Sequence, residues 1–213
     1  MTIALEDSST QQTTSSSFTA TPSSTPTDGN LLLAGVVVGT GETVSAAPSG
    51  WTLVGSRQEG NGKVTAYLYS KVASGESGSY TWTLSSSVPN VCGYMEWSNV
   101  NTLDIDDSVS SSGDQPTSAT LSLASNANDE TLIVHVAAYD PDASISVGWS
   151  HATQLVGGTS TGGEVAHENN FNPPGTRADG NRLDSSVSYA IVSAGFYYDP
   201  GISSVILRRR RMR

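Results

Sequence analysis

The chain has 213 residues, a length that fits one all-β domain, and this length is enough to build a core without disulfide staples. It carries 20 acidic and 10 basic residues, for a formal net charge of −10. An acidic body repels nucleic acid, so we do not expect nucleic acid to be a partner. A single cysteine, Cys92, excludes an intrachain disulfide and a cysteine-based zinc site. The start of the chain has no basic segment followed by an apolar one, which predicts that there is no signal peptide.

The first predicted elements lie in residues 3–38. Residues 6–30 are rich in Ser and Thr, and Ile3, Leu5, Phe18 and Ala20 alternate with polar neighbours, so we predict one or two polar strands. The longest apolar run, residues 31–38, follows. It is too short to span a membrane, which needs about 20 apolar residues, and we expect no membrane partner. Its continuous apolar character predicts a central strand covered on both faces.

A hairpin and an alternating strand are predicted next. Trp51 begins a strand, and residues 59–63 contain Asn-Gly, a strong hairpin signal. In residues 64–72, Val64, Ala66, Leu68 and Val72 share one face, while Thr65, Tyr67, Tyr69 and Lys71 share the other, as expected for a half-buried strand. Strands are predicted at residues 80–84 and 91–97, with a turn at Pro89 and Asn90. The acidic, serine-rich residues 101–118 are predicted to form a loop between two halves.

The second half repeats the theme of the first. Strands are predicted at residues 120–123, 130–139, 148–150, 154–157, 186–195 and 203–207, and the run near residue 132 echoes the run at 31–38. Residues 148–157 echo 50–55, and residues 186–195 echo 63–72. Two explanations remain: internal pseudo-symmetry, or a general likeness among sandwich strands. We favour the second because few residues are identical. The expected fold is an all-β, antiparallel β-sandwich of the jelly-roll type, a single domain over residues 1–207 with little helix, followed by an Arg-rich tail at 208–213.

The sequence offers no motif for catalysis, and we expect a non-enzymatic protein. The three histidines, His135, His151 and His167, lack metal-ligand spacing. His135 is predicted to be a core or half-exposed strand residue, and His167 lies in a long polar segment that is either a recognition loop or simply mobile. No nucleophile elbow or carboxylate pair of a sandwich glycosidase is found, and Glu96 is interpreted as a solvated face residue.

Two other groups of residues are candidates for binding. Asp104, Asp106 and Asp107 could supply oxygen ligands to Ca²⁺, but they lack an EF-hand pattern, so we expect no cofactor and keep Ca²⁺ only as a weak candidate at these three residues. Tyr67 and Tyr69 lie opposite the inferred core and could form an interface or a ligand platform, whereas Trp51 and Trp82 are expected in the core.

The C-terminal arginines are a third candidate. They could be a solvated end, dock on an acidic partner, or touch nucleic acid, and we favour docking on an acidic protein surface. These residues are Arg208, Arg209, Arg210, Arg211 and Arg213.

Four segments carry a resemblance to a known class of proteins. Residues 29–34, 48–54, 69–76 and 80–82 resemble a jelly-roll module of tailed viruses, found in capsid decoration, head-fibre, turret or tail-tip proteins of phages and archaeal viruses. The resemblance covers roughly residues 15–100, is followed loosely by the second half, and brings no catalytic residues.

The resemblance implies a virion surface protein that stabilises the particle, assembles as a homo-oligomer, binds the major capsid protein or another virion component, and could take part in host adhesion. Its implied location is the virion, after synthesis in the host cytoplasm. The alternative is a carbohydrate-binding module or a host-attachment domain of a tail or cell-surface protein, with a host glycan as partner. A third class is a hydrolase on the same scaffold.

Overall fold

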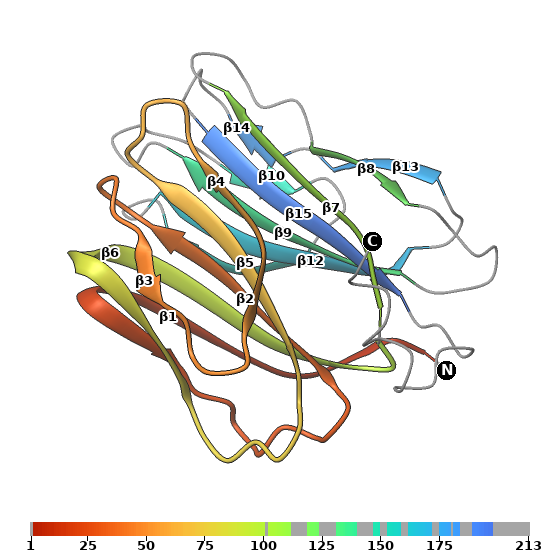
Figure 1. The fold of residues 1–213 in the computed structure, drawn as a ribbon. Coiled ribbons are helices and arrows are strands. Elements are labelled where there is room, and N and C mark those ends of the chain that lie inside the picture. The colour runs from red at the N-terminus through yellow and green to blue at the C-terminus, as the bar shows by residue number, and fades with distance from the viewer. Residues whose placement is uncertain are drawn as a thin grey trace, which may run out of the picture.

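The protein is an antiparallel β-sandwich, which confirms the predicted fold class (Figure 1). A computed structural model describes residues 2–100, 102–111, 119–123, 131–139, 147–149, 153–158, 162–171, 175–179, 181–183 and 189–197. Within these ranges every regular element is a strand. No helix in the described ranges is long and apolar enough to cross a membrane.

The first layer of the sandwich is formed by the first half of the chain. Its strands follow the order β1-β6-β2-β5-β4, and the short β3 pairs with β6. The bounds are β1 Ala4–Ala20, β2 Leu31–Val38, β3 Val44–Ala46, β4 Thr52–Gln58, β5 Thr65–Val72 and β6 Tyr80–Ser98. The predicted hairpin at residues 59–63 joins β4 to β5, where the Glu59 carboxylate accepts hydrogen bonds from the amides of Asn61 and Lys63.

The second layer is formed by the second half of the chain, in the order β7-β15-β9-β12-β11. Its bounds are β7 Thr102–Ser111, β9 Thr131–Tyr139, β11 Thr153–Gly158, β12 Gly163–Phe171 and β15 Tyr189–Tyr197. Two further pairs complete the half: β8 (Ala119–Leu123) with β13 (Gly175–Asp179), and β10 (Val147–Trp149) with β14 (Asn181–Leu183). Because each sheet uses one half of the chain, the sandwich is confirmed but a jelly-roll connectivity is not.

The run at residues 31–38 is the central strand of its sheet, as predicted. All eight residues of β2 are buried. Leu31, Leu33 and Val37 face the second sheet and join a core with Leu132, Val134 and other residues of β9, β12 and β15. Leu32, Ala34, Val36 and Val38 face the other way and join a second, aromatic-rich core. Two buried faces explain why this strand is apolar without alternation.

The two sheets have the same strand order, so the fold has internal pseudo-symmetry. Taken in chain order, β1, β2, β4, β5 and β6 occupy the same positions as β7, β9, β11, β12 and β15. Leu31 opposite Trp97 corresponds to Leu132 opposite Phe196. The interpretation of the echoes as mere sandwich likeness is therefore wrong. By position, β15 corresponds to β6 and not to the strand at residues 64–72.

Irregular pairings recur at equivalent places, which strengthens this correspondence. The β4–β5 register shifts between Leu53 and Gly55, and the β11–β12 register shifts between Gln154 and Val156. The extra residues, Val54 and Leu155, both pack against the core between the sheets. A bulge re-aims a side chain, and here it directs one residue of each edge strand to the shared core.

Three predictions of turns or loops are wrong because strand pairing overrides local composition. Pro89 lies inside β6, where its carbonyl accepts a hydrogen bond from the Gly39 amide just beyond the end of β2. The pairing of β6 with β2 ends at Asn90, one residue after Pro89. The missing N–H of Pro89 therefore removes no hydrogen bond from this pairing. Residues 102–111 form β7, an edge strand that pairs with β15, and residues 163–171 form β12 instead of a loop. The predicted strand at residues 203–207 lies outside the described residues.

The two sheets pack tightly against each other at two glycines, Gly35 and Gly163. A Cβ atom at Gly35 would lie 2.7 Å from both methyl carbons of Val165 and 2.8 Å from a methyl carbon of Val136. A Cβ atom at Gly163 would lie 2.6 Å from Cβ of Val37. Ordinary carbon contacts are about 3.5–4.0 Å, so these positions have no room for a side chain as the layers stand.

The second core exists because the long β1–β6 ribbon folds over the outer face of its own sheet. The Gln11 side-chain oxygen accepts a hydrogen bond from the Thr19 amide, 2.8 Å away, although eight residues separate them in the strand. The pairing of β1 with β6 is irregular between Ser15 and Ser17, where the ribbon bends. Beyond the bend, Phe18 and Trp82 stack on each other, 5.4 Å between ring centroids, and close the outer core.

Candidate functional site

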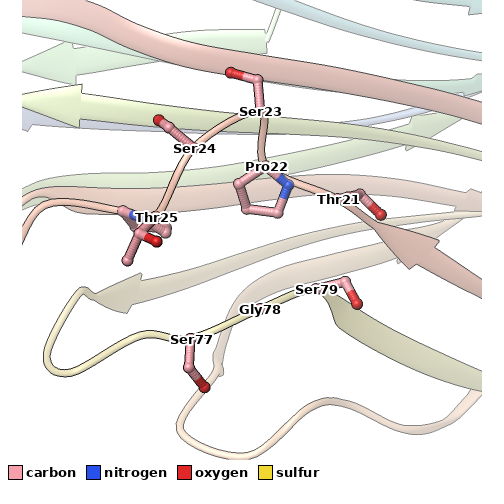
Figure 2. A pocket seen from close by; sticks show the side chains of 9 residues that line it. Thr21, Pro22, Ser23, Ser24, Thr25, Ser77, Gly78 and Ser79 are labelled. Atoms are coloured by element: carbon pink, nitrogen blue, oxygen red, sulfur yellow. The ribbon is translucent and has the colours of Figure 1, made fainter.

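In the described part of the chain, a cavity lies where β1 and β6 separate. Their ladder ends at the pair Ala20 and Tyr80, and beyond it residues 21–26 and 77–79 diverge. The space between them has a volume of about 360 Å³. Figure 2 shows the two segments facing each other, with the Pro22 ring directed toward Gly78. We call this cavity the 21–26/77–79 groove.

A second cavity adjoins the groove through Thr21. It has a volume of about 300 Å³ and is lined by Ser9, Thr10, Gln11, Thr19, Ala20, Thr21 and Cys92. It lies inside the bend of β1, because residues 9–11 and 19–21 come from opposite sides of that bend. Neither cavity has a charged side chain in its lining.

Carboxylates outside the lining hold the first wall of the groove. Asp7 accepts hydrogen bonds from the Ser23 amide at 2.7 Å and the Ser23 hydroxyl at 2.8 Å. Glu96 accepts a hydrogen bond from the Thr27 amide at 2.9 Å and another from the Asn30 side-chain amide at 2.6 Å. Glu96 is only 2 % exposed, so its interpretation as a solvated residue is wrong: two donors of the loop satisfy it in the interior.

A third carboxylate holds the second wall. Glu76, next to Ser77, forms a salt bridge with Lys71 at 2.8 Å and accepts a hydrogen bond from the Tyr80 hydroxyl at 2.9 Å. Burial raises the pKa of Glu76, but hydrogen bonds from Lys71, the Ser74 amide and Tyr80 outweigh it and hold the pKa below its ordinary value. Lys71 also lies 5.5 Å from the centroid of the Tyr80 ring. Both walls are thus fixed without any ligand.

Tyr67 and Tyr69 lie opposite the inter-sheet core, as predicted, but they are not exposed. They are 8 % and 6 % exposed and belong to the outer core. Their rings stack on each other, and Tyr69 also contacts Trp82 at 6.1 Å between centroids. Burial raises the pKa of Tyr69 to about 12. A role at an interface or as a ligand platform stays a prediction, and this burial weighs against it because the outer core already covers the rings.

Two of the three histidines, His135 and His167, and the cysteine lie in the interior. The Nδ1 atom of His135 is 2.7 Å from the Ser193 hydroxyl, and both residues are buried, which confirms His135 as a core residue. His167 packs edge-on against Trp97, and burial lowers the pKa of its imidazole. Burial raises the pKa of the Cys92 thiol to about 12. His151 lies outside the described residues.

The remaining predicted site residues are not tested. Asp106 and Asp107 pair with Ala194 and Ser193 along β7, and Asp104 lies at the register shift of that strand, but their side chains lie outside the described part of the chain. The Ca²⁺ site at these residues therefore stays a prediction. The five tail arginines also lie outside the described residues: Arg208, Arg209, Arg210, Arg211 and Arg213.

The comparisons with known proteins identify no relative. The chain matches no protein family, no curated protein and no solved structure. The 21–26/77–79 groove was missed by sequence reasoning, although residues 21–26 contain two prolines among serines and threonines, a composition typical of a loop. Nothing in the local sequence shows that residues 77–79 lie opposite this loop.

Proposed function

We propose that the protein is a non-enzymatic structural protein of a virus particle, placed on the particle surface as a decoration, head-fibre or turret subunit. In this role it stabilises the particle by binding the major capsid protein or another virion protein, and it assembles with copies of itself. The proposal begins from the resemblance of residues 29–34, 48–54, 69–76 and 80–82 to viral surface modules.

One observation carries the proposal: three of the four segments with the resemblance meet in a single cluster of side chains. Trp51 contacts both Tyr80 and Trp82, with 5.1 Å between ring centroids in each pair. Lys71, which is paired with Glu76, also reaches the Ser49 carbonyl and lies 5.5 Å from the centroid of the Tyr80 ring, so it ties three of the segments together. This aromatic and ionic cluster fastens the outer layer to the sheet. Such a motif serves rigidity, which a shell component needs.

Localisation on purified particles tests the proposal. An antibody raised against this chain, used with gold labelling on intact particles, should decorate the particle surface, and the chain should be found among the particle proteins by mass spectrometry. Absence of the chain from purified particles would refute the proposal. Light scattering on the isolated protein should show a stable oligomer. Turnover of a polysaccharide by the purified chain would contradict the non-enzymatic assignment.

A further inference from the structure

We propose that the 21–26/77–79 groove, extended by the adjoining cavity at Thr21, binds a neutral saccharide. The inference is independent of where the protein is located. It rests on the shape, the charge and the free hydroxyl groups of the two cavities.

The lining of the groove is rich in hydroxyl groups. The described structure gives no hydrogen bond to the hydroxyl groups of Thr21, Ser24, Thr25, Ser77 and Ser79. Each hydroxyl can donate one hydrogen bond and accept two, which matches the hydroxyl groups of a sugar. In Figure 2 the Pro22 ring stands between the two segments. It offers an apolar surface on which the C–H face of a sugar ring can pack.

The charges around the two cavities favour a ligand that is itself uncharged. No charged side chain lines either cavity. Asp7, Glu76 and Glu96 lie just behind the walls, and the whole chain has a net charge of −10. Lys71 neutralises Glu76, but the described structure gives Asp7 and Glu96 no such partner, and no cation lines either cavity to bind a sulfated, phosphorylated or carboxylated ligand. The groove therefore selects a neutral ligand.

The two walls of the groove are held in place by contacts within the protein. Asp7 holds Ser23, Glu96 holds Thr27, and Glu76 is held by Lys71 and Tyr80. Both walls are anchored within a few residues of the lining, so a ligand does not have to order them. Loops ordered before binding reduce the entropic cost of association.

The test is binding of the intact protein to an array of neutral and acidic oligosaccharides, followed by titration of each bound neutral oligosaccharide. Gly78→Leu is the blocking variant: Gly78 lines the groove, and a Cβ atom there meets nothing within 4 Å, so the chain has room for a large side chain at this lining position. Ser56→Leu, at an exposed position of β4 on the opposite edge of the sheet, is the matched control. Thr25→Val removes one hydroxyl group from the lining and keeps the shape of the side chain. Its control is Thr14→Val, the same substitution at an exposed position of β1.

We expect capture of a neutral oligosaccharide, a loss of affinity of about tenfold or more in Gly78→Leu and a smaller loss in Thr25→Val, with both controls unchanged. All four variants should melt within a degree or two of the parent, roughly the shift of a surface substitution. No capture by any neutral glycan, capture of acidic glycans only, or equal binding by Gly78→Leu and Ser56→Leu would overturn the inference. None of these outcomes bears on the location of the chain on particles, so the two proposals fail separately.

Discussion

The close approach of the two sheets at Gly35 leads to a quantitative prediction for Gly35→Ala. The new Cβ atom would lie 2.7 Å from both methyl carbons of Val165. Because ordinary contacts begin near 3.5 Å, about 0.8 Å of separation must be found in a core held by β-branched side chains with few rotamers. Overpacking of this kind costs about 1–3 kcal/mol.

An opposing effect reduces this cost. Replacing glycine by alanine at a compatible backbone position stabilises a protein by about 0.4–1 kcal/mol, because it reduces the conformational entropy of the unfolded chain. Gly35 has no positive φ, so the backbone itself accepts alanine. The expected net loss is therefore about 1–2 kcal/mol in the free energy of unfolding, measured by urea denaturation.

Two controls isolate the steric origin of the loss. Gly78→Ala, where a Cβ atom meets nothing within 4 Å, should leave stability unchanged or slightly raised. In the double variant Gly35→Ala with Val165→Ala, the loss should be smaller than the sum of the two single losses, by about 1 kcal/mol. A Gly35→Ala protein as stable as the parent would refute the packing of the two layers at this position.

Three further predictions concern buried polar groups. Burial lowers the pKa of His167 from its ordinary 6.5, so the unfolded chain takes up the proton first as the pH falls. The free energy of unfolding should therefore decrease as the pH falls below 6.5. The difference in urea midpoint between the parent and His167→Gln should change over this pH range, and a constant difference would contradict the prediction. Glu96→Ala leaves the Thr27 amide and the Asn30 side chain without their acceptor, which should lower the free energy of unfolding in urea by about 2–3 kcal/mol. Glu96→Gln keeps an acceptor oxygen and should lose less stability. Equal losses in the two variants would contradict the role of that oxygen. The Cys92 thiol, whose pKa is raised to about 12, should resist a thiol-specific disulfide reagent in the native protein and react after unfolding in urea. A rapid reaction of the native protein with the reagent would show that the outer core is open.

Part of the fold could be predicted from local sequence patterns. The alternation of residues 64–72, the Asn-Gly hairpin and the two apolar runs identify strands, because the side-chain period of a strand is two and a continuous run needs cover on both faces. The assignment of Tyr67 and Tyr69 to the face opposite the inter-sheet core came from the same period. The candidate groove could not be found this way, since its two walls are far apart in the chain and only the end of the β1–β6 ladder brings them together.

What the sequence by itself determined is therefore the class of the fold, the central position of residues 31–38 and the faces of individual strands. Tertiary structure alone decided what covers each face and which strands are neighbours. The folded-over ribbon buries Tyr69, the pairing with β15 makes residues 102–111 a strand, and the shared strand order of the two halves emerges despite few identical residues. The physical reason is that periodicity records only that a side chain alternates between two sides, whereas burial and pairing depend on contacts between distant segments, which no local pattern contains.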